Sequence, residues 1–232
     1  MKKILLSIFI LISTLCAQNS ALEAFKKQDY EKAFNLYTVD AKAGDKVAQN
    51  ALSYLYFNGV GTEKNVKEGL FWLKKSAHGM DSVAQYDLAM MYLTGHNIEQ
   101  NSELAFTWLD SAADLGNANA QYNLALMYYK GDSADQNVTK AAELLEKAAI
   151  GGHEEAQKNI AIIYMQLLRF DDAIKWLEMD AKKGNVEAYY FLAEIYCEQE
   201  KFVKAKKWTK LSMESGNQAA NLLWHKYTLE QY

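Results

Sequence analysis

Alanine, a large aliphatic residue and tyrosine recur at fixed intervals along most of the chain. Ala84, for example, is followed by Leu88 four residues later and by Tyr92 eight residues later. Spacings of four and eight bring side chains onto one side of a helix, so each such segment is predicted to be a helix with one buried side. The alanines of these segments lie 36 residues apart at first and 32 apart later: Ala48, Ala84, Ala120, Ala156, Ala188 and Ala220.

A second helix is predicted to follow each of these segments. Its mark is a small residue followed three positions later by leucine or tryptophan, as in Ala105 and Trp108. Glycine then closes each repeat, and glycine readily adopts the left-handed conformation that ends a helix. Each repeat is therefore predicted to be a helical hairpin. A single hairpin cannot cover its own apolar faces, so successive hairpins must stack into a solenoid.

Composition agrees with a helical chain and excludes some partners. The 232 residues include no proline, the residue that breaks helix interiors, and 50% of them are apolar, which excludes wholesale disorder. The 25 basic and 29 acidic residues give a net charge of −4. Such a chain has none of the positive field that neutralises phosphates, so no nucleic-acid partner is expected.

The recurring positions resemble those of a known repeat. The series Ala120-x-x-x-Leu124-x-x-x-Tyr128-x-x-Gly131, followed by Ala141-x-x-Leu144 and Ala148-Ala149-x-Gly151, is similar to the Sel1-like repeat, a relative of the tetratricopeptide repeat. The resemblance covers about residues 20–232. It implies an all-α fold, a right-handed α/α superhelix of helical hairpins, and a role in binding other proteins.

We expect one solenoid domain over residues 18–232. Its repeats are expected at about residues 20–44, 45–80, 81–116, 117–152, 153–184 and 185–216, with a closing helix at 217–232. The second to fourth repeats contain seven-residue loops that end in Asn65, Asn101 and Asn137, which we expect to cap the second helices. The fifth and sixth repeats lack four residues, and they are predicted to turn at residues 168–171 and 198–201.

The N-terminus has the pattern of a secretory signal peptide. Lys2 and Lys3 precede an apolar run over residues 4–15 and then small or polar residues, which predicts a signal peptide at residues 1–17. The run is too short for a permanent membrane span. Cys16 is a weak candidate for lipidation. In lipobox sequences the residue before the cysteine is Gly, Ala or Ser, and here it is the bulky Leu15. We therefore expect a periplasmic or secreted protein.

The processed chain would keep one cysteine, Cys197. An intramolecular disulfide is then impossible. Two interpretations remain: a thiol buried in a helix, or an exposed thiol that pairs between chains.

A second row of large apolar residues lies opposite the packing side of the first helices. In related solenoids these helices line the concave wall, so the resemblance implies a groove for a peptide or protein partner. Tyrosine offers large contact area with little rotamer entropy to lose, which suits such a surface. The alternative is that part of this row packs between repeats. The predicted groove residues are Tyr54, Phe57, Tyr86, Met90, Leu93, Tyr122, Leu126, Tyr129, Ile162, Met165 and Tyr190.

No catalytic, metal or cofactor site is predicted. His153 begins a segment that resembles a zinc-protease helix, but Gln157 stands where the second histidine must be. Some secreted cysteine-rich members of the resembled family have been associated with penicillin binding and β-lactamase activity. Their regular cysteine pairs are missing here, so that activity is kept only as a minor alternative.

Asn137 lies in a possible glycosylation motif. Residues 135–139 resemble the extended bacterial sequon, with an acidic residue two positions before the asparagine and Thr139 two positions after it. The motif falls in a loop that the repeat pattern predicts to be exposed. Glycosylation of Asn137 and simple capping of a helix are both compatible with the sequence.

The function that these patterns favour is that of a binding scaffold outside the cytoplasm. An immunity or inhibitor role against a secreted effector is an alternative of the same class, because periplasmic proteins with this type of repeat have been linked to it.

Overall fold

The computed structural model describes residues 20–232, and every regular element in that range is helical. The predicted signal peptide and Cys16 lie outside the described residues. The all-α helical-repeat class is confirmed. No helix within residues 20–232 is both long and apolar enough to cross a bilayer.

Contacts divide the chain into two compact units. The N-terminal unit includes the described residues 20–127 and 132–135, and the C-terminal unit includes residues 128–131 and 136–232. The boundary falls at the end of α7. Residues 20–26 are helical and are followed by α2 (Tyr30–Lys42), α3 (Lys46–Asn58), α4 (Val66–His78), α5 (Ser82–Thr94), α6 (Ser102–Asp114) and α7 (Ala118–Lys130). Then come α8 (Val138–Ile150), α9 (Glu154–Gln166), α10 (Phe170–Lys182), α11 (Val186–Glu198), α12 (Phe202–Glu214), α13 (Ala219–Lys226) and the short helix η1 (Leu229–Gln231).

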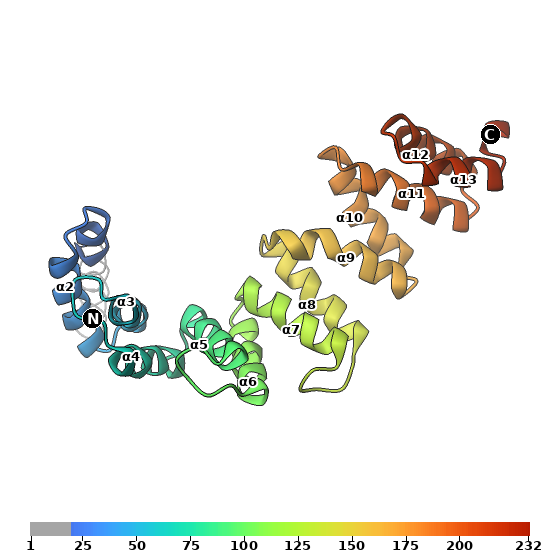
Figure 1. Ribbon diagram of the computed structural model, residues 1–232. Coiled ribbons are helices and arrows are strands. Elements are labelled where there is room, and N and C mark those ends of the chain that lie inside the picture. Colours follow the sequence, from blue (N-terminus) through green and yellow to red (C-terminus); the bar gives the residue numbers. More distant parts are fainter. Residues whose placement is uncertain (1–19) are drawn as a thin grey trace, which may run out of the picture. The chain divides into compact units, whose positions relative to one another are not determined.

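Helices pack against their neighbours along the chain. This holds from α2 to α6 in the N-terminal unit and from α8 to α13 in the C-terminal unit (Figure 1). The repeat positions form the interior, since Ala84, Leu88, Ala120 and Leu124 are at most 1% exposed. Stacking of hairpins is therefore what buries the apolar sides of the helices.

Capping side chains fix where the helices begin. Before the first helices, Asp45 accepts a hydrogen bond from the N–H of Ala48, and Asn117 accepts one from the N–H of Ala120. These bonds satisfy backbone donors that have no partner inside the helix. The predicted caps of the second helices are confirmed: Asn65, Asn101 and Asn137 accept from the N–H groups of Glu68, Leu104 and Lys140.

The seven-residue loops share one backbone geometry. The N–H groups of the three capping asparagines donate to the carbonyls of the repeat tyrosines Tyr56, Tyr92 and Tyr128, at 2.8–2.9 Å. The third residue of each loop has a positive φ: Gly61, Asn97 and Ser133. Only the first loop needs glycine there, because an added Cβ at Gly61 would lie 2.1 Å from the Tyr30 carbonyl oxygen. The later loops keep the left-handed turn without glycine.

A ladder of glutamine side chains ties α3, α5, α7 and α9 each to the helix before it. The Nε2 atoms of Gln49, Gln85, Gln121 and Gln157 donate to the carbonyls of Ala41, Ala77, Ala113 and Ala149, at 2.9–3.1 Å. Each bond satisfies a carbonyl at the C-terminal end of a helix. Tyr189 stands at the corresponding position of α11, and its hydroxyl donates to the Ala181 carbonyl at 3.4 Å.

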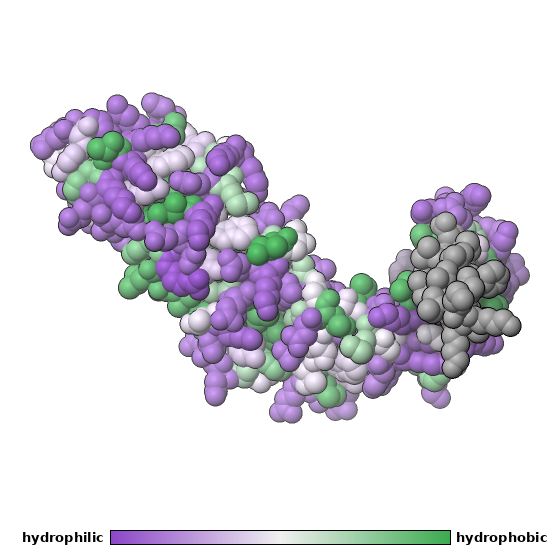
Figure 2. All heavy atoms as spheres, turned by 180° about the vertical axis from the view of Figure 1, so that it is seen from behind, coloured by the Kyte–Doolittle hydropathy of each residue, from purple (hydrophilic) through white to green (hydrophobic). Residues whose placement is uncertain are grey.

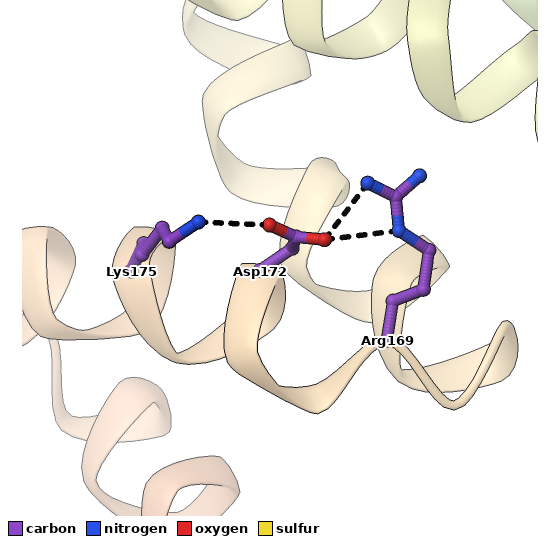
Figure 3. Close-up of polar contacts among 3 residues, drawn as sticks. All are labelled: Arg169, Asp172 and Lys175. Carbon is purple, nitrogen blue, oxygen red and sulfur yellow. Dashed lines mark hydrogen bonds and ion pairs between the residues drawn. The ribbon is translucent and has the colours of Figure 1, made fainter.

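The fifth repeat replaces the long loop with a tight turn. The predicted turn at residues 168–171 is confirmed: the N–H of Arg169 donates to the Tyr164 carbonyl, and Leu168 has a φ of 55°. The Arg169 guanidinium lies 4.5 Å from the Tyr164 ring centroid. It also donates to Asp172, which accepts from Lys175 on its other oxygen (Figure 3). A charged network therefore holds the start of α10 where no asparagine cap is present.

Candidate partner-binding site

The predicted groove residues all reach the surface. Tyr54 and Ile162 are exposed, at 54% and 40%, and the other nine are half-buried. Half-burial fits both interpretations of this row, because a half-buried side chain packs on its neighbours and still contacts solvent. Apolar side chains at the surface lie in separate groups among polar ones on the face shown in Figure 2.

A pocket of about 710 Å³ lies between α3 and α5 in the N-terminal unit. It brings together three of the predicted residues, Tyr54, Phe57 and Met90. Leu73 of α4 also lines it, and the loops after α3 and α5 contribute Lys64, His96 and Asn97. Its size falls within the range of about 300–1,000 Å³ that is usual for small-ligand sites.

Phe57 takes its place in the wall because α4 has glycine opposite it. An added Cβ at Gly69 would lie 2.7 Å from Cδ1 of the Phe57 ring. Other repeats have alanine at this position, for example Ala105 and Ala141. The missing methyl group therefore makes room for a large aromatic ring beside the pocket.

Asp87 gives the pocket a carboxylate. It is half-buried on α5 and lines the pocket beside Met90. Burial raises the pKa of this carboxyl, the nearby Asp81 raises it further, and a hydrogen bond from Asn50 acts in the opposite direction. Within the described part of the chain, Asp87 forms no ion pair. Sequence reasoning missed this residue, although Asp87 is the only acid at the third position after a repeat alanine.

The other predicted residues of the N-terminal unit lie outside this pocket. They are Tyr86, Leu93, Tyr122 and Leu126. The hydroxyl of Tyr86 accepts a hydrogen bond from the Asn123 amide at 3.4 Å, which links α5 to α7. These residues share the half-buried row with the pocket but do not line it.

In the C-terminal unit the predicted residues have polar neighbours. The Tyr129 hydroxyl donates to the Gln166 side chain at 3.4 Å, and the Tyr190 hydroxyl donates to Glu194 at 3.5 Å. Burial raises the pKa of Glu194, and Glu198 raises it further. Ile162 and Met165 complete the predicted set on α9.

Cys197 is buried, at 1% exposure. Burial raises the pKa of its thiol to about 11. The structure therefore favours the buried-thiol interpretation over a surface thiol that pairs between chains.

Two further candidates from the sequence have structural roles. His153 caps α9, where its Nδ1 accepts from the N–H of Ala156. Asn137 is exposed at the start of α8, where its Oδ1 accepts from the N–H of Lys140. Its glycosylation stays a prediction. No group of three or more metal-ligating His, Cys, Asp or Glu side chains occurs within residues 20–232.

Paired helices of equal length that repeat along the chain define a helical-repeat protein. The sequence model of the Sel1 repeat family matches residues 23–45, 46–79, 82–117, 118–153 and 186–217. These segments make up well over half of the sequence, so the chain belongs to the Sel1 repeat family. Residues 154–185, which contain the shortened fifth repeat, lie outside the matched segments.

Solved structures of the same family are similar to this chain. A Sel1 repeat protein from Oxalobacter formigenes is 29% identical, with a TM-score of 0.65, and the match covers 88% of this chain and 84% of that one. The protein c5321, a protective antigen of uropathogenic Escherichia coli strains with an SLR fold, is 28% identical, with a TM-score of 0.63. That match covers 88% of this chain but only 46% of c5321, so this chain spans about half of its length. No curated protein matches the sequence significantly.

Proposed function

We propose that this protein is a periplasmic or secreted binding scaffold that holds a peptide or a segment of a protein partner along its first helices. Sel1 repeat proteins generally mediate protein–protein interactions, and this chain belongs to that family. The signal-peptide pattern of residues 1–17 supports the compartment. N-terminal sequencing of the protein purified from a periplasmic fraction tests the cleavage.

The half-buried aromatic and methionine side chains of the first helices carry the proposal. They are held by helices and therefore lose little freedom on binding, and each retains surface that a partner can cover. The pocket between α3 and α5 adds a concave site to this row. Tyrosine and other large side chains seated in or beside such pockets are typical of binding hot spots.

The proposal is tested by capture of a partner from periplasmic extract on the immobilised protein. The double variant Tyr86→Ala with Tyr122→Ala is expected to lose capture while its helical content and melting temperature stay nearly unchanged. Phe71→Ala is the matched control, because Phe71 is an aromatic residue of a second helix and is 55% exposed. It should capture the partner as the wild type does.

Two results would contradict the proposal. Capture that is unchanged in the double variant would show that the row is not the binding surface. Unfolding of the double variant would show that these tyrosines belong to the packing between repeats. Mass spectrometry of the captured partner would distinguish a general scaffold from an inhibitor of a secreted effector. Mass spectrometry of the immobilised protein itself would show whether Asn137 carries a glycan.

A further inference from the structure

The pocket between α3 and α5 combines an apolar wall with one carboxylate. Tyr54, Phe57 and Met90 supply large apolar surface, and Asp87 supplies an anionic group beside them. A site of this composition suits a ligand with a long apolar stem and a cationic head.

Asp87 is an unfavourable residue for folding alone. Its carboxylate is partly removed from water, it has no cationic partner within residues 20–232, and Asp81 lies near enough to raise its pKa further. Asp81 has a structural role, because it caps α5 through the N–H groups of Val83 and Ala84. Asp87 caps no helix in the described structure. Residues that lower stability are often retained for function.

A hydrogen bond from the Asn50 side chain orients the carboxylate. The Ser53 hydroxyl donates to the backbone carbonyl of Asn50 at 2.7 Å and lies 3.4 Å from its side-chain Oδ1. The amide of Asn50 in turn donates to Asp87. Asp87 therefore has one neutral donor, Asn50, and a carboxylate has further lone pairs that can accept hydrogen bonds from a ligand.

We infer that this pocket binds an arginine side chain of the partner peptide, with the guanidinium against Asp87 and the stem along Phe57 and Met90. This inference rests on the proposed binding function and specifies the ligand chemistry at one site. Arginine fits better than lysine, because its planar group pairs with a carboxylate through two hydrogen bonds, stacks on aromatic rings and is more weakly hydrated.

Besides Tyr54 and Asp87, the titratable groups that line the pocket are Lys64 and His96, both from loops. Lys64 is exposed and forms no ion pair with Asp87 in the described structure. It repels a cationic ligand only through solvent, where such interactions are weak. Asp87 is half-buried, so its attraction for a bound cation is screened less.

The carboxylate of this pocket is particular to one repeat. The positions that correspond to Asp87 in the other repeats hold Ala51, Asn123, Asn159, Phe191 and Leu223. No other repeat therefore offers a carboxylate at this place, and the charge preference should map to the pair α3 and α5 alone.

The experiment is selection of peptides from a random display library on three purified proteins: the wild type, Asp87→Asn and Asp132→Asn. Asparagine has the shape of aspartate and keeps an acceptor for Asn50, so Asp87→Asn should fold, as circular dichroism would verify. Asp132 is an exposed loop residue, and its substitution makes the same change in charge away from the pocket. The wild type and Asp132→Asn should enrich peptides with an arginine among apolar residues, and Asp87→Asn should lose that enrichment.

A selected peptide is then compared with a version in which citrulline replaces arginine, which removes the charge and keeps the shape. Calorimetry should show roughly 10- to 100-fold weaker binding of the citrulline peptide to the wild type. Against Asp87→Asn, the two peptides should bind alike. An arginine preference that survives Asp87→Asn, or selected peptides without basic residues, would overturn the inference and leave the binding function standing. Failure of every protein to select any peptide would overturn both.

Discussion

Asp87 and Asp172 place the same carboxyl group in opposite surroundings, one in each compact unit. Asp172 accepts hydrogen bonds from Arg169 at 2.8 and 2.9 Å and from Lys175 at 3.0 Å. The hydrogen bonds from Lys175 and then Arg169 hold its pKa below the ordinary value. Asp87 has no such partner in the described structure, and burial followed by Asp81 raises its pKa.

The comparison distinguishes a carboxylate that stabilises a turn from one that is available to a ligand. Asp172 fixes a turn in which Arg169 also stacks on Tyr164. Asp87 lies in a pocket wall, where its neutral donor Asn50 orients the group without neutralising it. Electrostatic environment therefore distinguishes the two roles more clearly than residue type does.

The wall beside Asp87 can be tested at Gly69, where the largest effect on stability is expected. Gly69→Ala should lower the free energy of unfolding by about 1–3 kcal/mol, because the new Cβ would lie 2.7 Å from the Phe57 ring. Helix propensity alone predicts the opposite sign, a gain of about 0.5–1 kcal/mol. Urea denaturation decides between them, and a stabilised variant would show that the Phe57 ring is not tightly held.

Substitution of the paired carboxylate should lower the free energy of unfolding by a smaller amount. Asp172→Asn should lower the free energy of unfolding by about 0.5–1 kcal/mol at neutral pH. Because the pKa of Asp172 is lowered on folding, its contribution is present above the ordinary value of 3.8 and is lost as the pH falls through the folded-state pKa. Urea denaturation at neutral and acidic pH measures this, with Asp171→Asn as the exposed neighbouring control. Equal stabilities of wild type and Asp172→Asn at neutral pH would show that the charged network does not stabilise the turn.

Substitution of the unpaired carboxylate should change the free energy of unfolding in the opposite direction. Asp87→Asn should raise the free energy of unfolding by roughly 0.5 kcal/mol at neutral pH, since the half-buried charge is removed. The pKa of Asp87 is raised on folding. The wild type therefore keeps its full free energy of unfolding below pH 3.8, the ordinary aspartate pKa, and loses part of it as the pH rises through the folded-state pKa. The gain should therefore vanish in acid. Thermal melts across pH measure it, and a destabilised variant would indicate a structural role for Asp87.

The smallest effect is expected at the exposed lysine of the pocket. Lys64→Gln should strengthen binding of the arginine peptide by about twofold at low salt, and less at high salt. Lys67→Gln is the control, because Lys67 is exposed on α4 and does not line the pocket. Weaker binding by Lys64→Gln would mean that the lysine contacts the peptide instead of repelling it.

Much of the fold could be predicted from the sequence, because its determinants lie within one repeat. The spacing of Ala84, Leu88 and Tyr92 indicates a helix and its buried side, and asparagine at a loop end indicates a cap. The glutamine ladder was missed, because a polar residue such as Gln85 next to a buried alanine suggests solvent exposure. Only the packed hairpins show that its amide reaches the Ala77 carbonyl.

The candidate site was predicted less completely. Periodicity identified Tyr54, Phe57 and Met90, since they lie opposite the packing side of their helices. Asp87 was missed because its surroundings come from several elements: Asn50 is on α3, 37 residues away, and further lining residues are on loops. Periodicity places residues on a face but does not show which neighbours partly bury a charge.

Arginine binding in the pocket between α3 and α5 is tested most directly by an NMR titration of the Asp87 carboxyl carbon, with and without the arginine peptide. In the free protein the pKa of Asp87 should lie above the ordinary aspartate value, and it should fall when the peptide is added, because a bound cation favours the carboxylate. The pKa of Asp172 should not change. An Asp87 pKa that is the same with and without bound peptide would contradict the account.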